Sequence, residues 1–134
     1  MAKTAARKQQ ISETYMGDEH IAEFRAVLAS MLKECDREAA SAMGVLREED
    51  ERPSDDADRS DLSMRKEEKR NLVNRLAGRR VEIEAALHRI ESGEYGYCEE
   101  TGDEIGLARL RANPLARLCI EAQVRREHLG KLRA

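Results

Sequence analysis

The chain has 134 residues, of which 38% are charged and 3% aromatic, and its formal net charge is −3 with both signs interspersed. A broad globular core is hard to build from this composition, whereas apolar stripes on charged helices suit it. It has no strong basic field that would attract DNA, no run long enough to span a membrane, no signal peptide, and an odd number of cysteines. We therefore expect a soluble, cytoplasmic protein that binds neither DNA directly nor a membrane.

Residues 1–17 are polar and almost without apolar periodicity, which predicts a flexible N-terminal arm. A long helix is expected from Asp18, a plausible N-cap, to about Glu51. Its predicted apolar face consists of Ile21, Phe24, Leu28, Met31, Leu32, Cys35, Ala39, Met43 and Leu46. Because Cys35 lies on this face, we interpret it as a small buried hydrophobe rather than a ligand or nucleophile.

Residues 52–61 interrupt the helical pattern with a proline, four aspartates and no large apolar side chain. A breaker between two periodic segments is typical of the tip of an antiparallel helical hairpin. The second helix is expected to be capped by Asp58 or Ser60 and to end at Ser92, with Gly93 in the left-handed C′ position. Its predicted stripe consists of Leu62, Leu72, Val73, Leu76, Ile83, Leu87 and Ile90. We thus predict a coiled-coil hairpin over residues 18–92 with an acidic tip at residues 52–61.

Residues 93–134 have a different character, with four closely spaced glycines that indicate a compact, turn-rich module. Cys98 and Cys119 each begin a C-x-x-X pair whose spacing matches a zinc ribbon or treble-clef knuckle, but Thr101 and Ala122 stand where the second cysteines would be. A short C-terminal helix should follow, with its apolar side packed on the base of the hairpin. The predicted fold is therefore mainly α: a long antiparallel hairpin, a small zinc-finger-like module and a short C-terminal helix.

This module carries the residues of a family resemblance. They are Gly93, Tyr95, Gly96, Cys98, Gly102, Ile105, Arg109, Leu110, Pro114 and Cys119. Their order and spacing resemble the DksA/TraR family signature, which reads G-x-Y/F-G-x-C-x-x-C-G-x-x-I, then R-L, P and a second C-x-x-C. The resemblance covers the chain from about Gly17 to its C-terminus and includes a long hairpin placed before the finger, as in DksA.

The resemblance implies a non-enzymatic transcription regulator, expected to be a monomer, that binds bacterial RNA polymerase through its secondary channel. In DksA-like proteins the hairpin tip lies near the catalytic centre and alters initiation during starvation. The family tip motif D-x-x-D-x-A falls here on Asp55, Asp58 and Ser60. Because Ser60 replaces a small apolar alanine, we expect polymerase binding to persist while the effect on initiation weakens.

The finger departs from the family pattern at Thr101 and Ala122. Two thiolates cannot complete a closed tetrahedral zinc site, so we expect no metal; zinc with an added carboxylate from Glu99, Glu100 or Asp103 stays open as the alternative. Without metal, the module would be held by packing. The expected packing residues are Tyr95, Tyr97, Ile105, Leu107, Leu110, Leu115 and Leu118.

The resemblance also implies an alarmone site, because ppGpp in DksA-like proteins lies between the polymerase and basic residues of the regulator. The aligned positions read Arg75, Glu82 and Gln123. Only Arg75 keeps a cation; Glu82 and Gln123 replace lysines. We therefore expect the synergy with ppGpp to be weakened.

Two alternatives remain at this stage. One is a Gre-like factor that stimulates transcript cleavage through tip carboxylates holding a second metal ion, although the chain lacks the β-rich C-terminal domain of such factors. The other is a coiled-coil scaffold or dimerisation protein, in which the apolar stripe would make contacts between chains.

Overall fold

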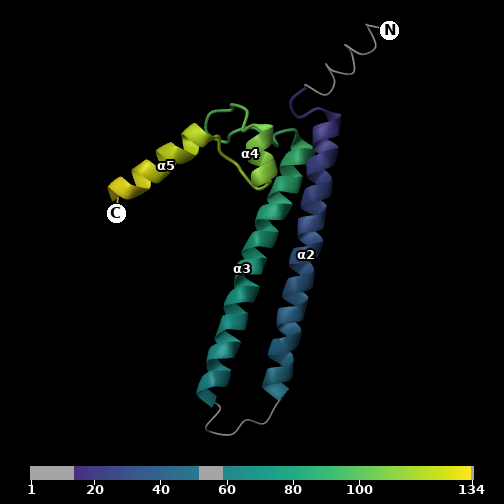
Figure 1. Cartoon of the computed structure of the whole chain (residues 1–134), viewed down its shortest axis with the longest axis vertical. Helices are drawn as coiled ribbons and strands as arrows, with labels where there is room; N and C mark the ends of the chain where they lie inside the picture. Colours follow the sequence, from purple (N-terminus) through teal and green to yellow (C-terminus); the bar gives the residue numbers. More distant parts are fainter. Residues whose placement is uncertain (1–13, 52–58, 134) are drawn as a thin grey trace. The chain divides into compact units, whose positions relative to one another are not determined.

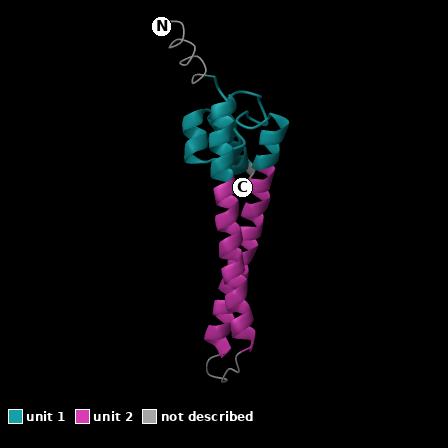
Figure 2. Cartoon of the chain, turned by 90° about the vertical axis from the view of Figure 1, so that its right-hand side faces the viewer, with its two compact units in different colours: residues 1–28, 86–134 teal, residues 29–85 magenta. Residues whose placement is uncertain are grey.

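The structure is a computed structural model that describes residues 14–51 and 59–133. Its described helices are α2 (Asp18–Glu51), α3 (Arg59–Ser92), α4 (Leu107–Ala112) and α5 (Ile120–Arg133) (Figure 1). This confirms the predicted mainly α fold with a helical hairpin and a short C-terminal helix. The chain divides into two compact units: unit 1 contains residues 1–28 and 86–134, and unit 2 contains residues 29–85 (Figure 2).

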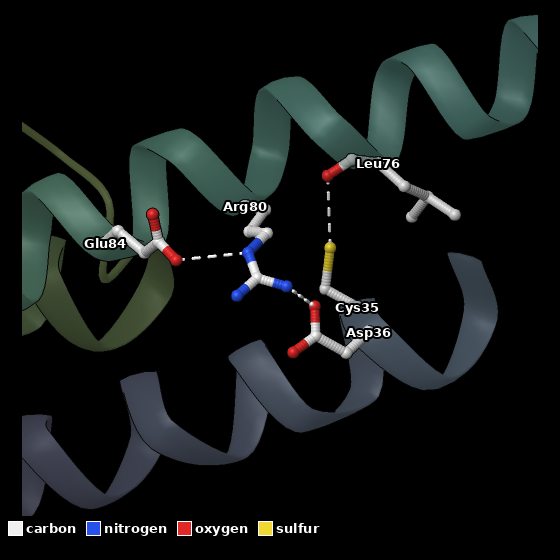
Figure 3. A network of polar contacts seen from close by, with 5 residues as sticks. All are labelled: Cys35, Asp36, Leu76, Arg80 and Glu84. Atoms are coloured by element: carbon white, nitrogen blue, oxygen red, sulfur yellow. Dashed lines mark hydrogen bonds and ion pairs between the residues drawn. The ribbon is translucent and has the colours of Figure 1, made fainter. Parts of the chain in front are cut away.

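Unit 2 is an antiparallel pair made from the C-terminal part of α2, from Ala29 on, and most of α3 (Figure 2). Its buried apolar side chains are Cys35, Ala42, Leu76 and Ile83. The Cys35 thiol donates a hydrogen bond to the Leu76 carbonyl oxygen at 3.2 Å (Figure 3). Cys35 is buried and its hydrogen bond joins α2 to α3, which confirms the interpretation of Cys35 as a packing residue.

Charged contacts also join the two helices of unit 2. The Arg80 guanidinium lies between Asp36 of α2 and Glu84 of its own helix, and its Nε donates to Glu84 at 3.1 Å (Figure 3). Nearer the hairpin end, Lys66 Nζ is 2.7 Å from Asp50 Oδ1. The hairpin therefore combines a narrow apolar seam with ion pairs between a mostly acidic α2 segment and a mostly basic α3 segment.

The apolar seam stops before the hairpin end. Among the described residues, none in 43–51 or 59–75 is buried. Met43, predicted to be in the core, is 49% exposed, and its neighbour Ala42 is buried instead. The prediction was wrong by one position because the rotation of α2 is set by where α3 packs, which apolar periodicity alone does not determine.

The helix ends follow local rules. At the end of α3, Glu94 N–H donates to Arg89 C=O at 2.9 Å and Gly93 N–H donates to Ile90 C=O at 3.3 Å. This pair of bonds is a Schellman motif, and Gly93 adopts the predicted left-handed conformation with φ 77°. At the start of α2 the prediction was wrong by one residue: Asp18 is already helical, and Gly17 C=O accepts the bond from Ile21 N–H.

Unit 1 gathers the bulkiest buried side chains, which include Phe24, Leu28, Tyr95 and Leu110. The rings of Phe24 and Tyr95 lie 5.5 Å apart, and the Tyr95 hydroxyl donates to Pro114 C=O at 2.7 Å. Burial raises the pKa of Tyr95 to about 12. The turn-rich module after α3 is therefore packed on the first turns of α2 through one aromatic contact.

The apolar side of α5 is exposed, contrary to the prediction that it packs on the hairpin base. The exposed members are Ile120, Val124, Leu129 and Leu132. Only Ala122, in the first turn of the helix, is fully buried among the residues of α5 whose side chains are described. None of the described helices is long and apolar enough to cross a membrane.

Ile83 and Val81 offer a matched test of this packing, because both are β-branched residues of α3 in unit 2. Ile83 is completely buried and Val81 is 65% exposed. Truncating Ile83 to alanine should lower the free energy of unfolding by about 2–5 kcal/mol, since a cavity replaces buried methyl groups. Val81→Ala should change it by less than about 0.5 kcal/mol. Denaturant unfolding followed by circular dichroism measures both, and equal effects would contradict the assigned helix rotation.

Candidate functional site

Two regions carry the predicted site residues, and the structure describes them unequally. Asp55 and Asp58 lie outside the described residues. Ser60 is exposed and already helical, because α3 begins at Arg59. The predicted tip boundary at residue 61 was therefore wrong: Arg59, Ser60 and Asp61 form the first turn of α3, where the helix dipole favours the Asp61 carboxylate.

The finger begins with a short hairpin between residues 96 and 105. Cys98 N–H donates to Asp103 C=O at 2.7 Å, and Ile105 N–H donates to Gly96 C=O at 2.8 Å. Gly102, with φ 75°, closes the turn by donating its N–H to Cys98 C=O at 2.9 Å. These hydrogen bonds fold the backbone around Cys98 into a tight turn. The positive φ at Gly102 is a conformation that glycine adopts most readily.

The four positions of the finger pattern meet in one place. Cys98 is 4% exposed, Cys119 is 3% exposed, and Ala122 is completely buried. The Thr101 hydroxyl lies 3.8 Å from Cys119 Sγ and accepts a hydrogen bond from Asp103 N–H at 3.2 Å. Both cysteines are free thiols. A threonine hydroxyl and an alanine methyl group thus occupy the two places where the pattern has cysteines.

The Cys98 thiol has an unusual acidity. Burial raises the pKa of this thiol. Hydrogen bonds from the Thr101 side chain and from the backbone N–H groups of Cys119, Thr101 and Glu100 lower the pKa by more than burial raises it, so that the net pKa is about 6. Hydrogen bonds that favour the charged form stabilise a thiolate. The bond from Cys119 N–H also shows that the two cysteines are neighbours in space.

These residues do not fit a closed zinc site. Among residues 14–51 and 59–133, no group of three or more His, Cys, Asp or Glu side chains is placed to hold a metal ion. Two of the carboxylates considered as additional ligands are engaged elsewhere: Glu99 lies 4.0 Å from Arg117, and Glu100 pairs with Arg126. Two thiols without a third donor fall short of the four ligands of structural zinc.

Tyr15 is a functional neighbour of the finger that the sequence analysis missed. Its hydroxyl donates to Gly96 C=O and accepts from Gly106 N–H at 3.0 Å. Its ring meets the Tyr97 ring edge to face at 5.6 Å. Any side chain at Gly96 would collide with Met16, whose Cγ lies 2.8 Å from the Cβ position. Residues placed in the predicted N-terminal arm therefore close the finger hairpin. Tyr15 and Gly96 are separated by 81 positions in the sequence, so no local pattern signals their contact.

Tyr97 corrects another expectation, because it is 37% exposed rather than part of the packed interior. Its backbone pairs with Glu104 in an isolated antiparallel bridge. The chain turns between the two tyrosines at Gly96, whose φ is 91°, so Tyr95 is buried while Tyr97 lies at the surface against Tyr15.

The three aligned alarmone positions are exposed. Arg75 and Glu82 are seven residues apart on α3 and so share one helix face. Gln123 on α5 accepts a hydrogen bond from Arg109 and donates one to Glu127 at 3.1 Å. Arg109 in turn donates to Leu118 C=O at 3.0 Å. A guanidinium therefore stands beside Gln123, a neighbour that the sequence analysis named only as part of the family signature.

Comparisons with known proteins agree with this architecture. Residues 93–128 match the model of the prokaryotic dksA/traR C4-type zinc finger. The chain is 38% identical over 122 residues to the RNA polymerase-binding transcription factor DksA of Caulobacter vibrioides, covering 86% of this chain and 81% of the relative. The protein of the same name from Escherichia coli K12 is 31% identical over 118 residues, with coverages of 87% and 77%. The solved structure of transcription factor DksA2 from Pseudomonas aeruginosa superposes with a TM-score of 0.84 at 34% identity, covering 93% of this chain and 98% of that one.

The Tyr15 contact predicts a measurable stability effect. Tyr15→Phe removes the hydroxyl that pairs with Gly96 and Gly106, and should lower the free energy of unfolding by about 1–3 kcal/mol. In a Cys35→Ser background it should also speed the reaction of the finger thiols with Ellman's reagent. Tyr97→Phe, which keeps the ring contact, is the matched control. Identical thiol reactivity in all three proteins would show that Tyr15 does not hold the finger closed.

Proposed function

We propose a function from the premise that the chain belongs to the DksA/TraR family. The protein binds bacterial RNA polymerase through its secondary channel and modulates transcription initiation. The observation that carries this proposal is the two-helix hairpin of unit 2, whose connecting segment contains Asp55 and Asp58. Relatives that the chain matches over most of their length are named RNA polymerase-binding transcription factors, and this naming supports the same partner here.

The tip would act through its carboxylates. A polymerase catalytic centre holds magnesium ions and basic side chains, both of which attract aspartate. A stem only two helices wide can carry Asp55 and Asp58 through a narrow opening, while Ser60, in the first turn of α3, offers a hydroxyl where the family has alanine. We assign no catalytic residue to the chain; it changes the polymerase reaction by binding.

The finger would serve as a metal-free structural module. Its support is the dense packing of Tyr95, Ile105 and Leu110, together with the hydrogen bonds of the 96–105 hairpin. The family is named for a C4-type finger, and this chain keeps two of the four cysteines. Elemental analysis of purified protein should accordingly find substoichiometric zinc.

Transcription in vitro tests the function directly. Purified polymerase is assayed on a ribosomal promoter with and without the protein, and the lifetime of open complexes is measured. Asp58→Asn should abolish the effect and leave most polymerase affinity, because the substitution removes the charge and keeps the size of the side chain. Asp61→Asn, the same charge change one helical turn further along, is the control and should stay active. An active Asp58→Asn protein would refute the tip assignment, and transcript cleavage in stalled complexes would favour a Gre-like factor.

We further assign Arg75, Glu82 and Gln123 to a weakened alarmone site. Arg75 can bind phosphate with a forked pair of hydrogen bonds, whereas Glu82 on the same helix face repels it. The Arg109 guanidinium beside Gln123 supplies part of the charge that a lysine would have provided. The site therefore keeps the positive charge of Arg75 and gains that of Arg109, but it lacks the family's positive charge at Glu82 and Gln123.

A titration of ppGpp in the transcription assay tests this assignment. The Glu82→Lys, Gln123→Lys double variant should need roughly tenfold less ppGpp for its half-maximal effect, corresponding to about 1.4 kcal/mol in binding. Glu84→Lys, a charge reversal two residues along α3, controls for the general gain of positive charge. Full synergy in the wild-type protein, with no gain in the double variant, would contradict the proposal.

A further inference from the structure

We propose that Cys98 and Cys119 form a binding site for one soft, thiophilic monovalent metal ion, of which Cu(I) is the appropriate probe. The inference starts from the disagreement between the finger pattern and its residues. Four cysteines suit zinc, but the two that remain are adjacent, buried and free. The proposal concerns only unit 1 and does not depend on polymerase binding.

The sulfur atoms of Cys98 and Cys119 both lie next to Thr101. Cys98 Sγ accepts the backbone N–H of Cys119 and a hydrogen bond from Thr101, and the same Thr101 hydroxyl lies 3.8 Å from Cys119 Sγ. The two thiols thus share the Thr101 hydroxyl as a common neighbour. Backbone bonds on both sides of Cys98 hold its position within the 96–105 hairpin.

Cys119 lies at the start of α5. Cys119 immediately precedes α5, and its carbonyl accepts the bond from Gln123 N–H at 3.0 Å. It therefore occupies the N-cap position, where the positive end of the helix dipole favours the negative charge of a bis-thiolate metal complex. Ala122, completely buried one turn later, offers no ligand atom where the family pattern has its fourth cysteine.

The donor set selects the ion by number and softness. Thiolates are soft ligands that favour Cu(I), and a d¹⁰ monovalent ion is satisfied by two of them in a linear arrangement. Zinc in a structural site needs four ligands, and the nearby oxygen donors Glu99 and Glu100 are paired with arginines. Binding replaces the sulfur–proton bonds with two metal–sulfur bonds, releases the thiol protons to solvent and leaves a bis-thiolate complex of charge −1; no oxidation state changes.

Anaerobic titration of the reduced full-length protein with Cu(I), in competition with the chelator bathocuproine disulfonate, tests the proposal. We expect one Cu(I) per chain, an ultraviolet thiolate-to-copper absorption band, and no comparable retention of Zn²⁺. Cys98→Ser and Cys119→Ser should each lose this binding. Cys35→Ser, which removes the buried thiol of unit 2, should leave the stoichiometry unchanged. Far-UV circular dichroism checks that each variant keeps its helices.

A gain-of-ligand variant keeps the test decisive even if the serine variants unfold. Thr101→Cys, Ala122→Cys restores the four-cysteine set and should convert the site to tight Zn²⁺ binding. The proposal is overturned if wild-type protein binds no Cu(I) in the competition, if it binds Zn²⁺ as tightly as the four-cysteine variant does, or if a folded Cys98→Ser protein binds Cu(I) as wild type does.

Discussion

The contact between Phe24 and Tyr95 is the interaction on which unit 1 depends. The chain has one phenylalanine, three tyrosines and no tryptophan, and all four aromatic residues lie in unit 1. They form two ring pairs: Phe24 with Tyr95 in the interior, and Tyr15 with Tyr97 at the surface. Because aromatic side chains contribute the largest buried areas, this small set can hold a turn-rich module that has no sheet or long helix of its own.

The hairpin of unit 2 follows a different principle, because its sequence contains no aromatic residue. Small buried side chains such as Cys35 and Ala42 allow the two helices to lie close together. Beyond the end of the buried seam, the helices are joined by the ion pair between Lys66 and Asp50. Exposed ion pairs add little free energy, so the end of the hairpin is held less firmly than its middle. A thin polar rod of this kind suits the proposed entry into a narrow channel better than a thick, rigid core would.

The finger keeps its backbone arrangement with two of the four cysteines of the family pattern. Thr101 and Ala122 are smaller or less reactive than cysteine, and the hydrogen bonds of the knuckle persist around them. Tyr15 lies outside the finger in sequence, and its hydroxyl holds the two ends of the 96–105 hairpin together through hydrogen bonds to the backbone at Gly96 and Gly106. Of the four cysteine positions in the family pattern, this chain keeps the two neighbouring thiols of Cys98 and Cys119. The metal ion proposed for this site is therefore one that two thiolates can hold.

Sequence alone determined the features that depend on local rules. Apolar periodicity predicted both long helices, the proline and aspartates of residues 52–61 predicted the break between them, and Gly93 predicted the helix end, because each signal acts within a few residues. The spacing of Cys98 and Cys119 likewise predicted their convergence, through a resemblance that fixes order along the chain. The roles of Asp55 and Asp58 rest on that resemblance alone.

Only the tertiary structure decided which face of each helix is covered and by what. Ala42 rather than Met43 is buried because the partner helix, not the periodicity, sets the rotation of α2. The apolar stripe of α5 looked like a packing face and is exposed, since only the first turn of the helix, at Ala122, is buried. Tyr15 reaches Gly106, 91 residues away, and Arg109 reaches Gln123 across a loop. Such contacts depend on how distant segments fold together, and no local pattern in the chain encodes them.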